Sequence, residues 1–514
     1  MADMLASFAN LFSLQPLSLL ALGVALGIVV GAIPGLTATM LIALTLPLTF
    51  YMDSVNAITL LVGMYVGGIS GGLITATLLR MPGTPASIMT TFDGFPLARG
   101  GQPGRALGLG IASSFVGGLI SWCFLAGLSP PLATLALRFG PWEYFTMVLM
   151  ALVMLASLAQ GSMIKGLIAG CLGMVLAMPG MDPSLGQMRL TFGFHDLDAG
   201  LKLLPVLIGA FAISQVIKDA VEIDWKPKML AVRRKGILIG VRDFKTHSIN
   251  MLRSSVIGTW IGLLPGIGAN IAAMMAYSTT KSLSKEPQKF GTGHEPGIVS
   301  AETANNASIG GAMIPLITMG IPGSVVDAIL LGALIIHNMQ PGPLLFQTNP
   351  EVAYGFISSY LVANFIMFGL MIGAIAYIAK VMYIPKSYLL SAVLVFCVIG
   401  SYALGNRFFD VWVMLVFGLI GFGLEYCKVP LGPFVIGFVL SPIAEEQLRS
   451  ALMLSEGSFL DLFTRPMATA FVAVSVLSLL WPIYQGRLAR RQREATARNQ
   501  AIGETERQQE GTPE

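Results

Sequence analysis

The sequence predicts an all-α protein that crosses a membrane many times. Of its 514 residues, 54% are hydrophobic and only 11% are charged, whereas a soluble domain carries about a quarter charged residues. Its longest apolar runs also reach roughly the twenty residues that cross a bilayer core. We expect about ten to fourteen membrane segments, a range rather than a number because helices broken by Gly and Pro escape hydropathy windows.

Apolar runs follow one another along most of the chain. The long ones extend over 17–33, 57–79, 107–128, 145–158, 167–178, 352–379, 389–404 and 467–481, and further runs are shorter or interrupted by Gly and Pro. No Lys or Arg precedes Arg80. The first run therefore lacks the basic region of a cleaved signal peptide, and we expect it to be retained.

Basic residues concentrate in two stretches, one between Lys218 and Arg253 and one in the tail from Arg487 to Arg493. Both are expected to be cytoplasmic, because basic residues beside membrane segments stay on the inner side. Nucleic-acid binding would also explain basic clusters, but their position next to membrane segments already accounts for them. We expect no nucleic-acid partner.

An internal repeat divides the chain. The pattern G-x-x-x-G-x-x-P-G occurs at 27–35 and again at 258–266. In both places a Gly-Gly pair follows, and then a second Pro-Gly: Met-Pro-Gly-Thr at 81–84 and Ile-Pro-Gly-Ser at 321–324. Two matches in the same order indicate a duplication.

The repeat predicts four regions. We expect a first transmembrane repeat at 1–217, a basic cytoplasmic linker at 218–248, a second transmembrane repeat at 249–485, and a disordered cytoplasmic tail at 486–514 without apolar periodicity. Transporters built from two repeats bind their substrate where the repeats meet. Whether these repeats are inverted or parallel depends on the number of crossings, which hydropathy leaves open.

The Pro-Gly pairs mark candidate binding positions, because Pro lacks a backbone donor and Gly permits tight turns, so helices break there. Broken backbone at membrane depth is tolerated where it is buried in protein or lines a wet cavity. Helix N-termini exposed by such breaks suit a carboxylate. An interfacial turn is the alternative for any single pair, but matched pairs in two repeats favour binding.

The substrate-binding candidates are these pairs and the hydroxyl and amide side chains beside them. They are Pro34, Gly35, Thr37, Thr39, Pro82, Gly83, Thr84, Ser87, Pro265, Gly266, Asn270, Pro322, Gly323 and Ser324.

The small polar run at 300–308 supplies candidates for a coupling-ion site: Glu302, Asn305 and Asn306. Their oxygens suit a hard cation such as sodium, while a proton would bind Glu302. A helix start capped by Ser300, with Glu302 in its first turn, explains the same run. Both interpretations stay open. Asp327 is a further candidate carboxylate, and so is Asp93, which an Asp-Gly turn in a loop would explain.

Enzyme signatures are missing. His294-Glu295 lacks the second histidine of a zinc-protease helix, Gly266-Ile267-Gly268 lacks the third glycine of a dinucleotide site, and there is no P-loop. The four cysteines lie far apart and predict neither a disulfide framework nor a zinc site. We expect no catalytic residues, no cofactor, and no metal beyond a sodium ion.

These motifs resemble the large membrane subunit, TctA, of the tripartite tricarboxylate transporters. The resemblance covers nearly the whole chain to about residue 480. Its most specific stretches are 33–50, 71–101, 264–293, the run that begins at Ala301, and the later HNMQPGPLLF. The chain departs from the expected pattern at 294–297, where His-Glu-Pro-Gly stands in place of a shorter Glu-Gly.

The resemblance implies a multi-pass permease subunit in a bacterial inner membrane. It implies import of citrate or a related organic anion by alternating access, as a symport driven by a sodium or proton gradient. It also implies two partners, a small membrane subunit and a periplasmic solute-binding protein. A self-sufficient carboxylate permease or channel that needs no binding protein is the alternative, while a membrane enzyme would need a catalytic constellation that this sequence lacks.

Overall fold

The computed structural model describes residues 2–480, apart from 159–161, 183–185, 222–229, 231–235, 382–385 and 404. Much of the predicted linker (218–248) and the whole predicted tail (486–514) therefore lie outside the described residues.

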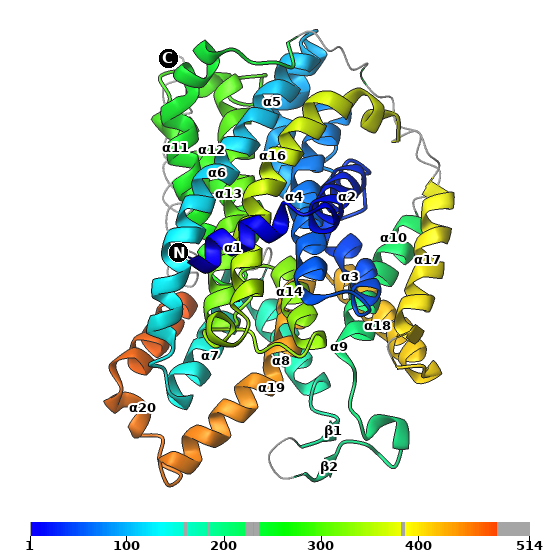
Figure 1. The fold of residues 1–514 in the computed structure, drawn as a ribbon, viewed down its shortest axis with the longest axis vertical. Helices are drawn as coiled ribbons and strands as arrows, with labels where there is room; N and C mark the ends of the chain where they lie inside the picture. Colours follow the sequence, from blue (N-terminus) through cyan, green and yellow to red (C-terminus); the bar gives the residue numbers. More distant parts are fainter. Residues whose placement is uncertain are drawn as a thin grey trace, which may run out of the picture.

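Helices build the structure (Figure 1). Those of the first half are α1 (Ala2–Leu11), α2 (Leu14–Gly31), α3 (Ala38–Thr49), α4 (Ser54–Leu79), α5 (Ile88–Arg99), α6 (Pro103–Ala136), α7 (Pro141–Leu158), α8 (Met163–Leu176), α9 (Leu203–Leu207) and α10 (Ser214–Val221). A π-helical stretch, Ile208–Ile213, joins α9 to α10. Two short strands, β1 (Gly180–Met181) and β2 (Met188–Arg189), form an antiparallel hairpin.

The second half contains a similar series. Its helices are α11 (Val241–Leu263), α12 (Gly268–Leu283), α13 (Glu295–Met319), α14 (Val325–Ile336), α15 (Leu345–Thr348), α16 (Pro350–Val381), α17 (Lys386–Ala403), α18 (Phe408–Tyr426), α19 (Leu431–Leu454) and α20 (Asp461–Thr464).

The predicted fold class is confirmed. Within the described residues, six helices are long and apolar enough to cross a membrane, and six shorter apolar helices of 10–17 residues accompany them. Three more, α11, α13 and α19, have 23, 25 and 24 residues but are more polar. The polar composition of α13 is compatible with a membrane because the helix is buried. It is enclosed by α6, α11 and α12, so its polar side chains do not contact lipid.

Corresponding helices of the two halves run in opposite directions. On α4 and α13, Ser70 bonds Asn306, while Tyr65, nearer the start of α4, reaches Ser324 beyond the end of α13. The two helices are therefore antiparallel. The longest helices, α6 and α16, are antiparallel as well, because Phe115 packs on Phe368 whereas Ser121 bonds Tyr360.

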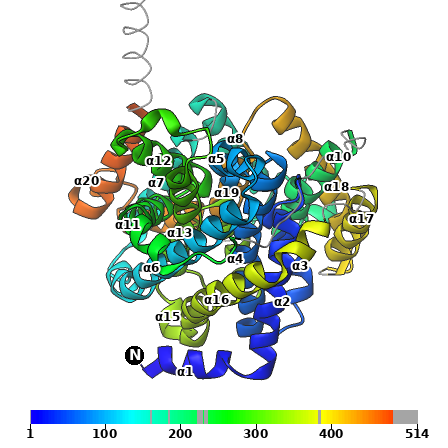
Figure 2. The same cartoon turned by 90° about the horizontal axis from the view of Figure 1, so that it is seen from above.

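The two halves also exchange peripheral helices. The helix at 203–221 packs on α17 and α18 of the second half, while α19 packs on α7 and α8 of the first half. In both views α10, α17 and α18 gather on the same side of the molecule (Figures 1 and 2). Separating the halves would therefore expose apolar surface on both sides of the central helices.

Glycines allow the central helices to pack with their backbones in contact. A Cβ at Gly67 of α4 would lie 2.2 Å from the carbonyl oxygen of Val24 on α2. In the second half, a Cβ at Gly258 of α11 would lie 2.4 Å from the carbonyl oxygen of Ala304 on α13. In the first repeat's G-x-x-x-G motif, a Cβ at Gly31 of α2 would likewise lie 2.2 Å from the carbonyl oxygen of Gly68. The G-x-x-x-G motifs of both repeats thus serve close helix packing.

Asp93 lies in α5 and is fully buried, so the predicted loop with an Asp-Gly turn is wrong. Its Oδ1 accepts hydrogen bonds from three backbone N–H groups, those of Gly291, Gly293 and His294, at 2.8 to 2.9 Å. Its Oδ2 accepts one from the Tyr277 hydroxyl at 2.8 Å. A carboxylate of the first half therefore caps α13 of the second half. These four donors lie about two hundred residues away along the chain, where a local sequence pattern gives no sign of them.

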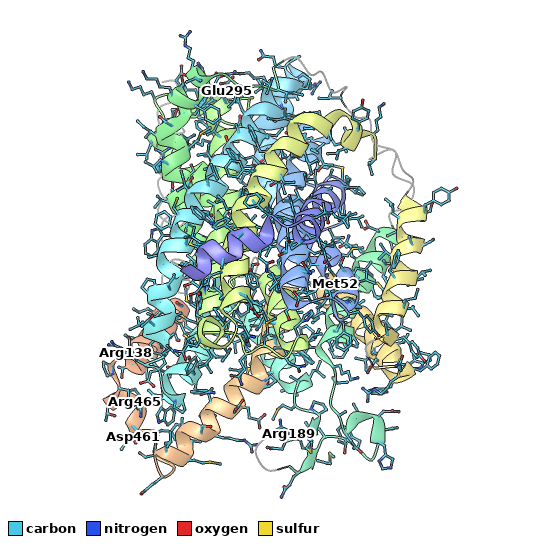
Figure 3. The ribbon with its side chains drawn as sticks, viewed as in Figure 1. Met52, Arg138, Arg189, Glu295, Asp461 and Arg465 are labelled. Carbon is cyan, nitrogen blue, oxygen red and sulfur yellow. The ribbon has the colours of Figure 1, made fainter. Side chains whose placement is uncertain are left out.

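The two ends of the helical bundle carry different charged clusters (Figure 3). Glu295 lies at one end, where Arg105 bonds both Glu295 and Asp243. Arg138, Arg189, Asp461 and Arg465 lie at the opposite end.

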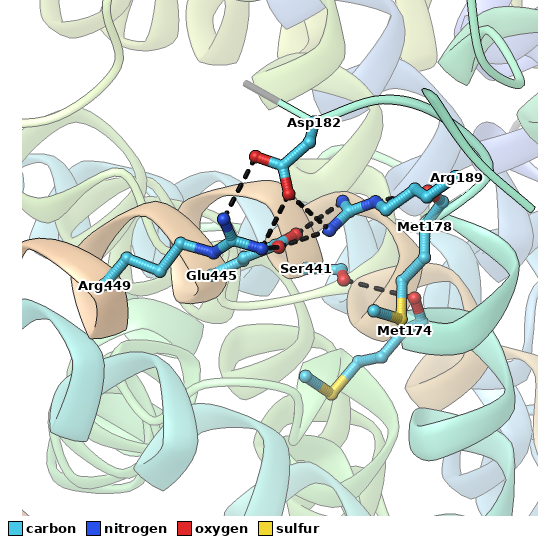
Figure 4. A network of polar contacts seen from close by, with 7 residues as sticks. All are labelled: Met174, Met178, Asp182, Arg189, Ser441, Glu445 and Arg449. Carbon is cyan, nitrogen blue, oxygen red and sulfur yellow. Dashed lines mark hydrogen bonds and ion pairs between the residues drawn. The ribbon is translucent and has the colours of Figure 1, made fainter. Parts of the chain in front are cut away.

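At that opposite end, a cluster of four charged residues holds the β1–β2 hairpin on α19 (Figure 4). Arg189 pairs with Glu445 and with Asp182, and Arg449 bonds Asp182 at 2.7 Å and Glu445 at 2.7 Å. Hydrogen bonds to Glu445 raise the pKa of Arg189 above its ordinary value. The charges satisfy one another, so this cluster serves to brace the hairpin.

We predict that Gly67→Ala lowers the melting temperature of the purified protein by several degrees. The added Cβ must push α2 away from α4, and such overpacking costs about 1–3 kcal/mol. Gly369→Ala on α16 is the matched control, because a Cβ there meets no atom within 4 Å. Equal melting temperatures for the two variants would contradict the backbone contact between α2 and α4.

Candidate functional site: a cavity among the interrupted helices

A cavity of about 450 Å³ lies where the residues that follow all four Pro-Gly pairs come together. The residues of these interruptions that line it are Gly266, which belongs to a pair, and the following residues Thr37, Ala38, Thr39, Thr84, Pro85, Ala86, Ile267, Gly268, Ala269, Asn270, Ile271, Ser324, Val325 and Val326. The rest of the wall comes from Tyr65 and Ile69 of α4, Leu155 of α7, Phe211, Ser214 and Gln215 of the 203–221 helix, Glu425 of α18, and 430–433 at the start of α19.

Four helix N-termini face this cavity. These are the starts of α3, α12 and α14, together with the turn Pro85–Ser87 that leads into α5. The first amide groups of a helix have no partner within the helix, and they carry about half a unit of positive charge. The cavity is thereby suited to an anion even though no Lys or Arg lines it.

Side chains cap three of the four N-termini. Thr37 Oγ1 accepts from the Met40 N–H at 3.2 Å, and Ser324 Oγ accepts from the Asp327 N–H at 3.4 Å. Ser87 Oγ bonds the Thr84 backbone on the third. α12 lacks a side-chain cap in the described structure. Its first amides are therefore the ones most available to a ligand.

Two glycines shape the approach to α12. Gly266 and Gly268 have φ of 77° and 71°, a left-handed conformation that favours glycine. A Cβ at Gly266 would also lie 2.0 Å from the Leu155 side chain. The Gly266 N–H donates to the carbonyl oxygen of Gly323 at 2.8 Å, which ties two of the four interruptions together.

The structure divides the predicted substrate residues into two groups. Six of them line the cavity: Thr37, Thr39, Thr84, Gly266, Asn270 and Ser324. The others, which do not appear in its wall, are Pro34, Gly35, Pro82, Gly83, Ser87, Pro265, Pro322 and Gly323. These residues form the turns behind the wall. Gly83, for example, sits where a Cβ would lie 2.3 Å from the Gly31 carbonyl oxygen.

Several further residues of the cavity wall were not predicted from the sequence. Tyr65 is the one ionisable residue of α4, and its place within an apolar run could have singled it out. Gln215 and Glu425 carry no such signal, because each lies within a helix that looks ordinary in sequence. Glu425 pairs with Lys218 at 3.2 Å, which places a cation near the edge of the cavity.

The predicted coupling-ion residues lie apart from the cavity, inside α13. Because α13 begins at Glu295, the helix-start interpretation of Ser300 and Glu302 is wrong; both are fully buried in the helix interior. Glu302 accepts a hydrogen bond on each oxygen, from Thr90 at 2.5 Å and from Ser114 at 3.1 Å.

The two asparagines of α13 differ in their hydrogen bonding. Asn306 accepts from Ser70 at 2.7 Å and donates to the Glu302 carbonyl oxygen at 3.3 Å. Asn305 is fully buried, and neither its Oδ1 nor its Nδ2 forms a hydrogen bond with a described residue. A buried amide without partners costs free energy, so its oxygen is available to a cation. No group of three His, Cys, Asp or Glu side chains suited to a metal occurs among the described residues.

Comparison with known proteins identifies one family and two related sequences. A family model described as the Tripartite tricarboxylate transporter TctA family matches residues 17–436. An Agrobacterium vitis protein described as an uncharacterized 52.8 kDa protein in the TAR-I ttuC' 3' region is 35% identical over 439 residues, covering 85% of this chain and 87% of its own. A second Agrobacterium vitis protein, from the TAR-II ttuC' 3' region, is 35% identical over 223 residues, covering 43% of this chain and 92% of its own. No solved structure matches.

The cavity predicts a difference in chemical access between two asparagines. With the four native cysteines replaced by serine, Asn270→Cys should react with a charged, water-soluble thiol reagent, because Asn270 lines the cavity and is partly exposed. Asn305→Cys, fully buried in α13, should react about tenfold or more slowly. The labelling rates are measured by mass spectrometry. Equal rates for the two variants would contradict the described cavity.

Proposed function

Because the chain belongs to the tripartite tricarboxylate transporter TctA family, we propose that it is the permease subunit that carries a carboxylate across the membrane through this cavity. It is a multi-pass membrane protein of a transporter family, not of an enzyme family. The proposed substrates are tricarboxylates such as citrate, or related organic anions. A periplasmic solute-binding protein delivers them, a small membrane subunit completes the complex, and the membrane is a bacterial inner membrane.

The meeting of four helix N-termini at one cavity is the observation that carries this proposal. Together they contribute about two units of positive charge, which offsets much of the charge of a tricarboxylate. Thr39, Asn270 and Ser324 add neutral donors around them. Because amide groups and helix dipoles bind the anion, the described wall of the empty cavity holds no unpaired Lys or Arg charge. The transporter can therefore change conformation without substrate bound.

The division of the cavity wall supports the proposal of alternating access. One side is formed by the four interruptions and α4, and the other by Leu155, the 203–221 helix and the α18–α19 connection. We propose that the two halves are inverted repeats, because their corresponding helices run in opposite directions. Movement between the two sides would open the cavity alternately to each face of the membrane.

We assign the end with Glu295 to the cytoplasm. Asp243, which lies in the predicted basic linker (218–248), pairs with Arg105 at that end, and basic segments stay on the inner side of a membrane. The β1–β2 hairpin then faces the periplasm, where a solute-binding protein would dock.

A sodium or proton gradient supplies the driving force in this proposal. Glu302, Asn305 and Asn306 form the proposed coupling-ion site, supported by the unpartnered, fully buried amide of Asn305. The carbonyl oxygens of amides and the oxygens of carboxylates are suitable ligands for a hard cation.

Uptake of radiolabelled citrate and other di- and tricarboxylates into proteoliposomes tests the proposed function. We expect uptake to require the small membrane subunit, the binding protein and an imposed sodium or proton gradient. Gradient-driven uptake by this chain alone would instead indicate a self-sufficient permease.

Asn270→Ala should weaken apparent citrate affinity about tenfold, the loss of one or two hydrogen bonds. Thr134→Ala, an exposed hydroxyl of α6, is the matched control and should leave it unchanged.

Asn305→Ala should weaken the dependence of uptake on the coupling cation, because it removes a buried oxygen that a cation can use. The measurement is the cation concentration that gives half-maximal uptake, which we expect to rise about tenfold, the equivalent of one ligand at about 1.4 kcal/mol. Asn349→Ala, on the loop before α16, controls for loss of an amide elsewhere. Unchanged cation dependence would exclude Asn305 from the ion site.

A further inference from the structure

Asp327 is a buried carboxylate that follows three residues of the cavity wall, Ser324 to Val326, in the sequence. It lies in the first turn of α14 and is fully buried. Ser324 Oγ donates to Asp327 Oδ2 at 2.6 Å, and the Tyr65 hydroxyl lies 3.0 Å from Ser324 Oγ. Ser324 and Tyr65 both line the cavity. One oxygen of the carboxylate is therefore connected to the cavity through two hydroxyl groups.

The other oxygen, Oδ1, has no hydrogen-bond partner among the described residues. Little in the surroundings can balance its charge, because α3 and α9 contain no ionisable residue. The ionisable residues of the other helices that pack on α14 are Tyr65 of α4, Glu295 and Glu302 of α13, and Glu445, Glu446 and Arg449 in the second half of α19. A carboxylate at membrane depth costs on the order of 3 kcal/mol, and no described ion pair offsets that cost for Asp327.

Helix capping alone does not explain why this position carries a charge. The first repeat has Gly83-Thr84-Pro85-Ala86-Ser87 where the second has Gly323-Ser324-Val325-Val326-Asp327. At the end of the first segment, the neutral Ser87 side chain occupies the corresponding place, and its Oγ accepts from the Thr84 N–H and donates to the Thr84 carbonyl oxygen. Comparing the two repeats therefore shows that a serine is sufficient at this position of the turn in the first repeat.

Asp327 also differs from Glu302, the carboxylate of the proposed coupling-ion site. Both oxygens of Glu302 accept hydrogen bonds from hydroxyl groups, and Glu302 is not part of the cavity wall. Asp327 keeps one oxygen open and is connected to the wall through Ser324.

We propose that Asp327 is a second cation-binding carboxylate of the transporter, and that it couples the cation directly to the substrate. The bound positive charge is a proton or a sodium ion, added at Oδ1. This inference rests on the proposed function. With Asp327 charged and empty, the carboxylate repels an anion in the cavity; with a cation bound, the repulsion disappears. Cation and anion therefore favour each other's binding, as linkage requires.

Asp327→Asn separates coupling from transport, because a neutral amide imitates the occupied carboxylate. In proteoliposomes that contain the full chain and its two partners, we expect the variant to exchange internal for external citrate within about twofold of the unmodified protein. Net citrate accumulation driven by a gradient should fall about tenfold or more. The reason is that this position stays neutral throughout the cycle, so cation binding and release no longer occur there. Asp327→Ser, which copies Ser87, should behave in the same way.

Glu286→Gln is the matched control, an exposed carboxylate between α12 and α13 that should change neither activity. Separate sodium and pH gradients distinguish the two cations: the gradient that drives accumulation in the unmodified protein, and fails to drive it in Asp327→Asn, identifies the one that binds.

Three results would overturn the inference. Accumulation with unchanged cation dependence in Asp327→Asn would overturn it while leaving the proposed function intact. Loss of exchange as well as accumulation in both variants, with normal elution on size exclusion, would also overturn it, because a neutral side chain should support exchange. Absence of exchange and accumulation in the unmodified complex would refute the proposed function, and the inference with it.

Discussion

Backbone hydrogen bonding at membrane depth is the constraint on which this structure depends. Each Pro-Gly pair interrupts a helix and leaves amide groups without partners, and lipid cannot satisfy them. The four interruptions therefore meet inside the protein, where Thr37, Ser87 and Ser324 cap three of the helices that follow. The Gly266 N–H bonds the Gly323 carbonyl oxygen. The backbone amide groups that remain without partners face one cavity. The same amide groups that the interruptions leave unbonded are therefore the ones that can bind an anion.

Close packing of the central helices makes this meeting possible. Glycines on α2 and α11 let these helices contact the backbones of α4 and α13, and α6 and α16 enclose the pair. The enclosure separates α13 from lipid, which is why a helix with Glu302, Asn305 and Asn306 in its interior is compatible with a membrane. Asp93 completes the arrangement by capping α13 from the other half. Polarity inside the bundle is thus a consequence of the packing around it.

Buried polarity is concentrated in two places that the proposed transport cycle would link. The cavity wall combines helix N-termini and neutral donors with Glu425, which pairs with Lys218, and α13 contains a carboxylate and amides away from it. Asp327 belongs to the cavity side, since Ser324 and Tyr65 connect it to the cavity wall. The two halves differ at this position: Ser87 and Asp327 occupy corresponding places in the two motifs, but only Asp327 is a carboxylate that can bind a cation.

The sequence by itself determined the fold class, the two repeats' shared motifs and the positions where helices break, because apolar run length and Pro-Gly chemistry are local properties. It also singled out Thr37, Thr39, Thr84, Asn270 and Ser324, which follow those breaks. Tertiary structure alone decided which residues face one another. Asp93 reads as a turn residue in sequence, yet its donors come from 291–294; Glu302 reads as a first-turn carboxylate, yet it is enclosed by α5 and α6. Gln215 and Glu425 join the cavity because α10 and α18 pack across the halves. Such contacts depend on how helices cross, which a one-dimensional pattern does not contain.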